Sequence, residues 1–470
     1  MEIDSLVKEW RELILKNSVV EAKKFYWEYM HPLVEKRFIE SVKEMKQSGL
    51  LPEYDWLIIP AGLEDYYYVL LINALKPKNV YFLCTPEFKN SFLDTVIRET
   101  KLRTEQYTVN VITYKGMDVA EVYEKIRENR GLFNGKVAVD LTRGKRIISA
   151  GSAIMASFFG FDLFYLDEDW MDDIKRGIPG TEELVQIKNP FHIFGDLKKS
   201  FAIELFNHYN FNSAALFFKE LCSKVKDPRE CEILALLSEA YYQWDGFNYQ
   251  AAYFKLQEAT NKIDQFQFRD IDKKLINNNL DIVKLMCEVQ KKGKIEDALK
   301  EDKLVANLLV DLYVNAKRRK DSGRFEDAIS RLYRLLELIS QYRLLKYKIA
   351  TSRPDYKHMP DLEEKYKDVT KKLYGGERYL PAELGIKDGH ILLFILEDDI
   401  WKTKKFDDLK NFLGPIRLRD DSIIAHGVNV IGEKGLRAVE SISKELLNKV
   451  FSSLGIDLGK LIEQHNFLKL

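Results

Sequence analysis

Five short apolar runs lie in the first half of the chain, separated by longer segments of mixed polarity. The runs are rich in β-branched and aromatic residues: WLIIPAG (56–62), NVYFLCTP (79–86), VNVITYK (109–115), KVAVDLT (136–142) and DLFYLD (162–167). Nearly continuous hydrophobicity over so few residues is typical of strands buried on both faces. The segments between them have the length of helices. This alternation predicts a Rossmann-like α/β domain, whose parallel sheet carries helices on both faces, with one edge strand added within 176–187.

The pattern changes on either side of this domain. Residues 1 to about 50 have the spacing of amphipathic helices, and from about 195 onward apolar residues recur at helical spacing around short Gly- or Asn-bearing turns. Several of these pieces are similar to tetratricopeptide-type helix pairs, although their spacing is irregular. We therefore expect an α/β domain with N-terminal helices at 1–190, a helical, tetratricopeptide-like region at 191–310 and a second helical domain at 311–470.

The charge balance, the cysteines and the absence of long apolar segments limit the classes of protein to which this chain can belong. Lys plus Arg equals Asp plus Glu, 73 each, so no bulk charge favours nucleic acid or an anionic membrane, and any such contact needs a local patch. The four cysteines lie far apart without a CxxC motif, which is typical of reduced thiols and predicts neither disulfides nor a zinc site. No signal peptide or membrane span is expected, so we expect a cytoplasmic protein.

Basic residues follow the fourth predicted strand, in VDLTRGKRIISAGSAIMA. Ligands of open parallel sheets bind at the carboxyl ends of strands, and a helix N-terminus there favours an anion. We therefore expect an anion at Thr142, Arg143, Gly144, Lys145 and Arg146, with Gly62 after the first strand allowing close approach of the backbone. A glycine turn with solvated basic side chains is the alternative. The loop matches neither G-x-x-x-x-G-K-[ST] nor G-x-G-x-x-G, so neither a P-loop nor a dinucleotide site is predicted.

The segment DLTRGKR resembles the Asp-x-Thr-Gly-Gly-x-Lys signature of CARF domains, the Rossmann-like sensors of CRISPR systems. Asp140, Thr142 and Gly144 match this signature, Arg143 replaces its first glycine, and Arg146 stands in place of its lysine. In that family the loop binds a cyclic oligoadenylate at a two-fold axis between protomers. The resemblance thus implies an activator of this class, with cyclic tetraadenylate as the expected ring, and no cofactor or metal.

A second motif lies in RLRDDSIIAHG (417–427). Arg419 and His426 are seven positions apart, so on a helix they would emerge within ~20° of each other. The pair fits the R-x(4–6)-H pattern of HEPN ribonucleases, although a solvated helix face explains the spacing equally well. An arginine can stabilise the charge of a transferring phosphate, and a histidine can move protons near neutral pH.

The order of parts, a CARF-like domain, a helical region and this motif, resembles the CARF–HEPN ancillary ribonucleases of type III CRISPR systems. The resemblance implies a homodimeric, metal-independent endoribonuclease that cuts single-stranded RNA to 2′,3′-cyclic phosphate ends. Its activator would be made by the type III effector, and its catalytic residues would be Arg419 and His426. Two alternatives remain: a ligand-gated helical adaptor or regulator without catalysis, and a CARF-domain enzyme that cleaves its own cyclic oligoadenylate.

Overall fold

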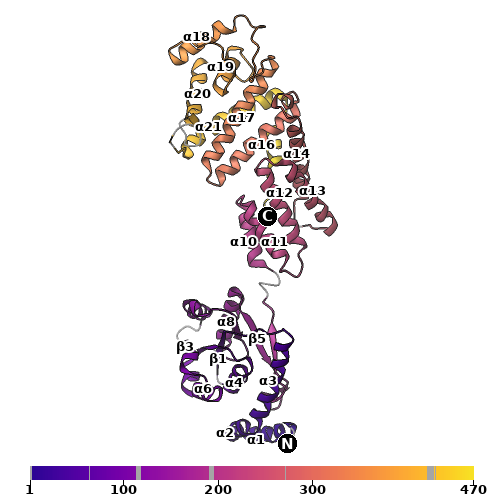
Figure 1. The fold of residues 1–470 in the computed structure, drawn as a ribbon, viewed down its shortest axis with the longest axis vertical. Helices are drawn as coiled ribbons and strands as arrows, with labels where there is room; N and C mark the ends of the chain where they lie inside the picture. Colours follow the sequence, from indigo (N-terminus) through magenta and orange to yellow (C-terminus); the bar gives the residue numbers. More distant parts are fainter. Residues whose placement is uncertain are drawn as a thin grey trace. The chain divides into compact units, whose positions relative to one another are not determined.

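The computed structural model describes residues 3–62, 64–112, 118–189, 195–269, 271–420, 428 and 430–470, with only the backbone described for 417–420. The chain forms two compact units, Met1–Gly195 and Asp196–Leu470 (Figure 1). The first unit is α/β and the second is helical. The predicted fold class, an N-terminal Rossmann-like domain followed by a helical region, is confirmed.

A six-stranded sheet forms the centre of the N-terminal unit, in the order β3-β2-β1-β4-β5-β8. Its strands are β1 (Trp56–Ala61), β2 (Asn79–Cys84), β3 (Tyr107–Val111), β4 (Val137–Asp140), β5 (Asp162–Asp167) and β8 (Glu183–Ile187). The first five run parallel, and β8 pairs antiparallel with β5 as the predicted edge strand. β1, β2, β4 and β5 lie within runs that the sequence marked as apolar, whereas β3 overlaps the run at 109–115 only in residues 109–111. Residues 113–115 of that run lie outside the described residues.

Helices cover both faces of this sheet, because alternate strand residues point in opposite directions. Leu57 and Ile59 pack with α3, α4 and α6, whereas Ile58 between them packs with α7 and α8. Figure 1 labels α3, α4, α6 and α8 around the sheet. The helices of this unit are α1 (Ile3–Leu15), α2 (Val19–Phe25), the π-helical segment η1 (Tyr26–Met30), α3 (His31–Gln47), α4 (Tyr66–Leu75), α5 (Pro86–Ser91), α6 (Leu93–Thr100), η2 (Thr104–Gln106), α7 (Val119–Glu128), η3 (Arg130–Leu132) and α8 (Arg146–Phe159).

A small subdomain is added to the unit by α1, α2, η1 and a short hairpin of β6 (Trp170–Met171) and β7 (Arg176–Gly177). Leu6, Trp10, Ala22, Tyr26 and Met30 form its buried core. Arg11 of α1 donates to Asp173 in the hairpin turn at 2.6 Å, which ties the first helix to the hairpin. The N-terminal helices thereby pack on the α/β domain close to the start of α4.

The second unit is built from helix pairs. Its helices are α10 (Asp196–Asn207), α11 (Phe211–Cys222), α12 (Arg229–Asp245), α13 (Tyr249–Phe266), α14 (Lys273–Lys291), α15 (Ile295–Ala298), α16 (Asp302–Asp321), α17 (Phe325–Lys346), α18 (Leu362–Tyr374), α19 (Ile386–Ile395), α20 (Phe406–Asp420), α21 (Glu433–Leu454) and α22 (Leu458–His465). One apolar core joins α10–α14 and another joins α16–α21. The helices of both groups are labelled in Figure 1.

The C-terminal residues return to the first of these cores. Phe467 stacks on Tyr241 of α12, with ring centroids 4.3 Å apart and planes 4° from parallel. The Arg318 guanidinium of α16 lies 3.8 Å from the centroid of the same Phe467 ring. The stacking joins residues that lie more than two hundred positions apart in the sequence, so α10–α14 and α16–α22 form one packed unit.

Candidate functional site

The loops after β1 and β4 meet where the strand order reverses. β1 pairs with β2 on one side and with β4 on the other, so the ends of β1 and β4 flank the switch point of the sheet. A Cβ added to Gly62 would lie 2.8 Å from the Cα of Gly144, and one on Gly144 would lie 2.5 Å from the Pro60 carbonyl oxygen. Gly144 also has a φ of +106°. Both positions therefore require glycine, for close backbone approach and, at Gly144, for conformation.

Asp140 and Thr142 fix the start of the loop. Asp140 ends β4, and its Oδ1 accepts hydrogen bonds from the Thr142 backbone N–H at 2.9 Å and from the Thr142 hydroxyl. The same hydroxyl oxygen accepts from the Leu166 N–H of β5 at 2.8 Å. The Asp-x-Thr part of the motif is thus engaged in holding the loop to the two neighbouring strands.

Removing the Thr142 hydroxyl should destabilise the N-terminal unit. Thr142→Val keeps the side-chain shape but leaves the Leu166 N–H and one carboxylate lone pair without their partner, which should cost about 1–3 kcal/mol. Urea denaturation followed by circular dichroism measures this loss. Thr108→Val on the edge strand β3 is the matched control and should change the free energy of unfolding little. Equal stability of the two variants would contradict the role given to the hydroxyl.

Asp140 should also make the stability of this unit depend on pH. Its carboxyl is fully buried, and burial raises its pKa to about 6, against the hydrogen bonds from Thr142 that lower it. Between about pH 4 and 6, the Asp140 carboxyl therefore stays protonated in the folded state, whereas in the unfolded chain it is already ionised. The Asp140 contribution to the free energy of unfolding should fall as pH rises through this window, and then stay constant.

Asp140→Asn isolates that contribution, because asparagine can still accept from Thr142 but does not titrate. The difference in free energy of unfolding between Asp140→Asn and the unsubstituted protein should change by on the order of 2 kcal/mol between pH 4 and 7, in favour of the variant at the higher pH. Chemical denaturation at several pH values measures it. A difference that stays constant with pH would contradict the raised pKa.

Arg143 is paired with carboxylates of its own unit. Its Nε lies 3.0 Å from Glu64 Oε2 and its Nη2 lies 2.5 Å from Glu168 Oε1. The guanidinium also donates to the Tyr67 hydroxyl and lies 4.1 Å from the centroid of the Tyr67 ring. Arg143 thus carries two charged partners, and its positive charge is balanced within the unit.

Lys145 and Arg146 lie at the N-terminus of α8. Lys145 is the residue that precedes the helix, and Arg146, its first residue, is exposed. A helix N-terminus adds unpaired N–H groups and a positive dipole end to these two charges.

A cavity of about 520 Å³ lies beside this helix end. Seven residues line it: Gly62, Glu64, Thr85, Glu87, Arg143, Gly144 and Lys145. Four of the six predicted anion-site residues are therefore in the lining, and the other two, Thr142 and Arg146, flank them in the same loop. The structure brings the predicted residues together at the switch point of the sheet.

The partners of Arg143 could be recognised in the sequence only in part. Glu64 stands in PAGLEDYYY after the first strand, and Glu168 stands one residue after the fifth. Neither residue was singled out from the sequence, although the carboxyl ends of parallel strands meet at one edge of a sheet, a signal that would have placed both at this edge. Which of them would reach Arg143 depends on side-chain geometry that spacing does not give.

The second motif lies on and beyond the end of α20. The backbone of Arg419 belongs to this helix, whereas its side chain and the whole of His426 lie outside the described residues. α20 is held against the core of the helical unit through Leu409, Phe412 and Ile416. Its Pro415 carbonyl accepts from the Tyr333 hydroxyl of α17 at 2.7 Å, which anchors the helix next to the position of Arg419.

Three of the described histidines are buried packing groups. His390 accepts from the Trp401 indole N–H at 3.3 Å through its Nδ1, and burial lowers its pKa to about 4. Burial also lowers the pKa of His31 and His465. Neutral imidazoles fixed in a core are poor proton carriers near pH 7. Among the residues that the structure describes, no group of three or more His, Cys, Asp or Glu side chains could hold a metal ion.

Two family models match the helical unit. A model described as the Csm6 HEPN domain matches residues 297–450, and one described as the Csm6 6H domain matches residues 194–287. The chain belongs to the Csm6 family. The HEPN match spans both Arg419 and His426, and the 6H match covers α10–α13 and most of α14.

A Csm6 relative and a solved Csm6 structure can be compared along most of the chain. The CRISPR system endoribonuclease Csm6 of Thermus thermophilus is 26% identical over 390 residues, which are 80% of this chain and 82% of the relative. The structure of Enterococcus italicus Csm6 bound to cyclic hexa-2'-fluoro-hexa-dAMP aligns with a TM-score of 0.46 at 10% identity, over 88% of this chain and 98% of that one. No helix in the described part of the chain is long and apolar enough to cross a membrane.

Proposed function

We propose that the chain is an endoribonuclease that a cyclic oligoadenylate activates in type III CRISPR defence. The observation that carries this proposal is the match of residues 297–450 to the Csm6 HEPN domain, which includes Arg419 and His426. The named activity of the Thermus thermophilus relative supports the same reaction. We assign the sensor to residues 1–190, a connecting helical region to 191–310 and the ribonuclease domain to 311–470.

The proposed reaction uses the RNA's own 2′-hydroxyl as nucleophile. The hydroxyl oxygen attacks the adjacent phosphorus, the bond to the leaving 5′-oxygen breaks, and the products are a 2′,3′-cyclic phosphate and a 5′-hydroxyl. His426 would move a proton near pH 7, and Arg419 would stabilise the extra negative charge of the transition state. Neither step requires a metal ion.

Each chain contributes one Arg419 and one His426, whereas the reaction needs an acid, a base and charge stabilisation. We therefore propose a homodimer with two-fold symmetry, in which two copies of the motif face each other. Light scattering of the full chain should give twice its 55.0 kDa mass, with or without activator. A stable monomer in the presence of activator and RNA would contradict the composite active site.

The activator is proposed to bind at the loop of Thr142–Arg146 and Gly62. In this proposal Lys145, Arg146 and the α8 N-terminus contact phosphate. Thr142, Gly144 and Gly62 would maintain the conformation of the loop. Arg143 would contribute through its ion pairs with Glu64 and Glu168. Cyclic tetraadenylate is the proposed ring, and the protein would act in the cytoplasm.

The test is cleavage of a labelled single-stranded RNA with cyclic tri-, tetra- or hexaadenylate, each with and without EDTA. We expect cleavage that one of the rings stimulates, that EDTA does not inhibit, and that leaves cyclic phosphate ends. Analysis of the nucleotide after the reaction shows whether the activator itself is degraded. Absence of RNA cleavage under every condition would favour a regulator without catalysis, and loss of cleavage in EDTA would contradict the metal-independent mechanism.

A further inference from the structure

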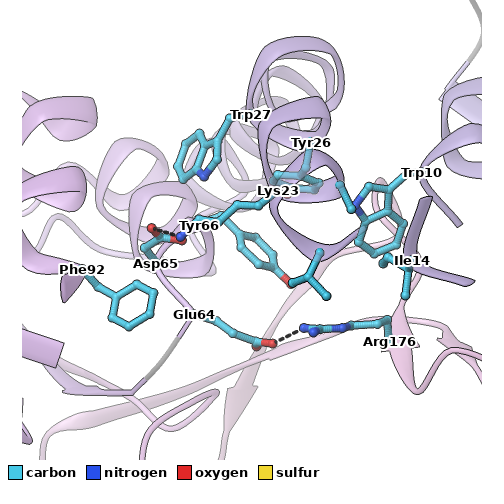
Figure 2. A pocket seen from close by; sticks show the side chains of 12 residues that line it. Trp10, Ile14, Lys23, Tyr26, Trp27, Glu64, Asp65, Tyr66, Phe92 and Arg176 are labelled. Atoms are coloured by element: carbon cyan, nitrogen blue, oxygen red, sulfur yellow. Dashed lines mark hydrogen bonds and ion pairs between the residues drawn. The ribbon is translucent and has the colours of Figure 1, made fainter. Parts of the chain in front are cut away.

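A second cavity of the N-terminal unit has five aromatic residues among the twelve that line it. It has a volume of about 330 Å³ and lies among α1, α2, η1, the start of α4 and the β6–β7 hairpin (Figure 2). Its aromatic lining residues are Trp10, Tyr26, Trp27, Tyr66 and Phe92. Aromatic walls of this kind bind flat ring systems by stacking, largely independently of their substituents.

Tyr26, one of the lining residues, has a buried polar group without a partner among the described residues. The residue is only 4% exposed, and its hydroxyl has no hydrogen-bond partner among the described residues. Burial raises the pKa of Tyr26 well above its ordinary value, so the hydroxyl keeps its proton and can donate. Buried polar groups in proteins almost always have a partner, and an exception therefore points to a missing ligand or water.

The backbone at this point is also unusual. Tyr26 and Trp27 begin the π-helical segment η1, which interrupts the otherwise regular path from α2 to α3. Single π-helical turns are rare and frequently occur at functional sites. Here the turn supplies two consecutive aromatic residues to the lining of one cavity.

The charged residues of the lining balance one another. Lys23 Nζ donates to Asp65 Oδ2 at 3.0 Å, and Arg176 Nη1 donates to Glu64 Oε1 at 2.9 Å (Figure 2). Asp65 is 2% exposed, so its charge depends on Lys23. A cavity whose charges are already paired favours an uncharged ligand with polar edges over an ion.

Glu64 connects this cavity to the loop of the proposed activator site. It lines both cavities. One of its carboxylate oxygens binds Arg176, and the other lies 3.0 Å from Arg143 Nε. A ligand that moves Arg176 or Glu64 therefore changes the partners of Arg143, two residues from Lys145.

We propose that the aromatic cavity is a second ligand site, which takes an uncharged planar heterocycle of nucleobase size, and that Glu64 couples its occupancy to the loop at 142–146. The heterocycle is either a base of the activating nucleotide or a free nucleoside, since both present the same ring. The coupling rests on the proposed function of the loop, whereas the binding of a nucleobase does not.

Calorimetric titration with adenosine tests the site, with ribose as the control that lacks a base. The unsubstituted protein should bind adenosine saturably and ribose not at all. Val19 lines the cavity but is 56% exposed, so Val19→Trp should fill the cavity without disturbing the core. It should weaken adenosine binding at least ~tenfold, which corresponds to ~1.4 kcal/mol. Tyr26→Phe removes only the unpartnered hydroxyl and should weaken binding by a smaller factor with unchanged thermal stability.

Cyclic tetraadenylate added to the same titration distinguishes the two sources. Competition with adenosine, lost in Val19→Trp, would identify the base of the activator as the occupant. A free nucleoside would be identified as the occupant if adenosine and cyclic tetraadenylate bind at the same time and each changes the affinity of the other. This mutual effect should be present in the unsubstituted protein and absent in Glu64→Gln. Simultaneous binding without mutual effect would overturn the coupling.

The site itself would be overturned if adenosine, guanosine, cytidine and uridine all fail to bind saturably. It would also be overturned if Val19→Trp bound adenosine as tightly as the unsubstituted protein. Because these titrations do not measure RNA cleavage, they can fail while the proposed ribonuclease activity stands. The reverse outcome, adenosine binding without ribonuclease activity, would leave this site in place.

Discussion

Replacing His426 with alanine should lower RNA cleavage about 10²–10⁴-fold, because in the proposed mechanism this residue moves a proton to or from the ribose and leaving oxygens. Arg419→Ala should be comparably damaging, since it removes the positive charge that we propose to stabilise the transition state. Both effects should fall on kcat, and binding of the activator should be unchanged. Single-turnover cleavage of a labelled RNA at saturating activator measures the rates.

The matched control is His208→Ala in the same helical unit. His208 is an exposed histidine of the turn after α10, with a side chain 78% exposed, so its loss should change neither rate nor stability. Thermal denaturation of all three variants should give the midpoint of the unsubstituted protein. Full activity of His426→Ala would show that the histidine of the HEPN match is not the catalytic group.

The double substitution Lys145→Ala/Arg146→Ala should weaken binding of the activator about 10²–10⁴-fold, as two charge-assisted contacts to phosphate are lost. Cleavage should recover largely at saturating activator, because Arg419 and His426 are untouched. Titration with a fluorescent cyclic oligoadenylate measures the affinity. Lys125→Ala/Arg127→Ala on α7 removes the same charge from the same unit and serves as the control.

Linkage makes this prediction stricter. If the activator tightens RNA binding by some factor, RNA must tighten activator binding by the same factor. Titration of His426→Ala with activator, in the presence and absence of uncleaved RNA, measures how much RNA changes the affinity for the activator. If neither affinity changes while cleavage still needs activator, the coupling lies in assembly of the catalytic geometry. An activator affinity that is unchanged in Lys145→Ala/Arg146→Ala would place the activator elsewhere.

The parallel sheet could be predicted from the sequence because its signal is local. Strands buried on both faces must be apolar at consecutive positions, so five short runs indicated β1 to β5. The observed boundaries are close to the predicted ones for four of these strands, whereas β3 begins two residues before its run and ends at Val111. α8 begins at Arg146 and ends at Phe159, within the helix-length segment between the fourth and fifth runs. The helical character of the second unit followed in the same way from apolar spacing.

The sequence predicted where the loop at the switch point lies, but only in part which of its charged side chains are paired. Parallel topology brings Gly62 and Gly144 to one edge of the sheet. The structure shows why each must be glycine, because an added Cβ would come too close to neighbouring backbone atoms. Three basic residues close together suggested three charges for an anion. The tertiary structure pairs Arg143 with Glu64 and Glu168, whereas Arg146 stays exposed at the start of α8.

By itself, the sequence determined the class of fold, the order of its parts and the family resemblance, because periodicity and short motifs are properties of neighbouring residues. The aromatic cavity at Tyr26 and the double role of Glu64 were decided only in the tertiary structure. Trp10, Tyr26, Tyr66 and Arg176 are far apart in the chain, and no local pattern marks them as neighbours. Which side chains line a cavity, and which charge neutralises which, depends on packing between elements that meet only after the chain has folded.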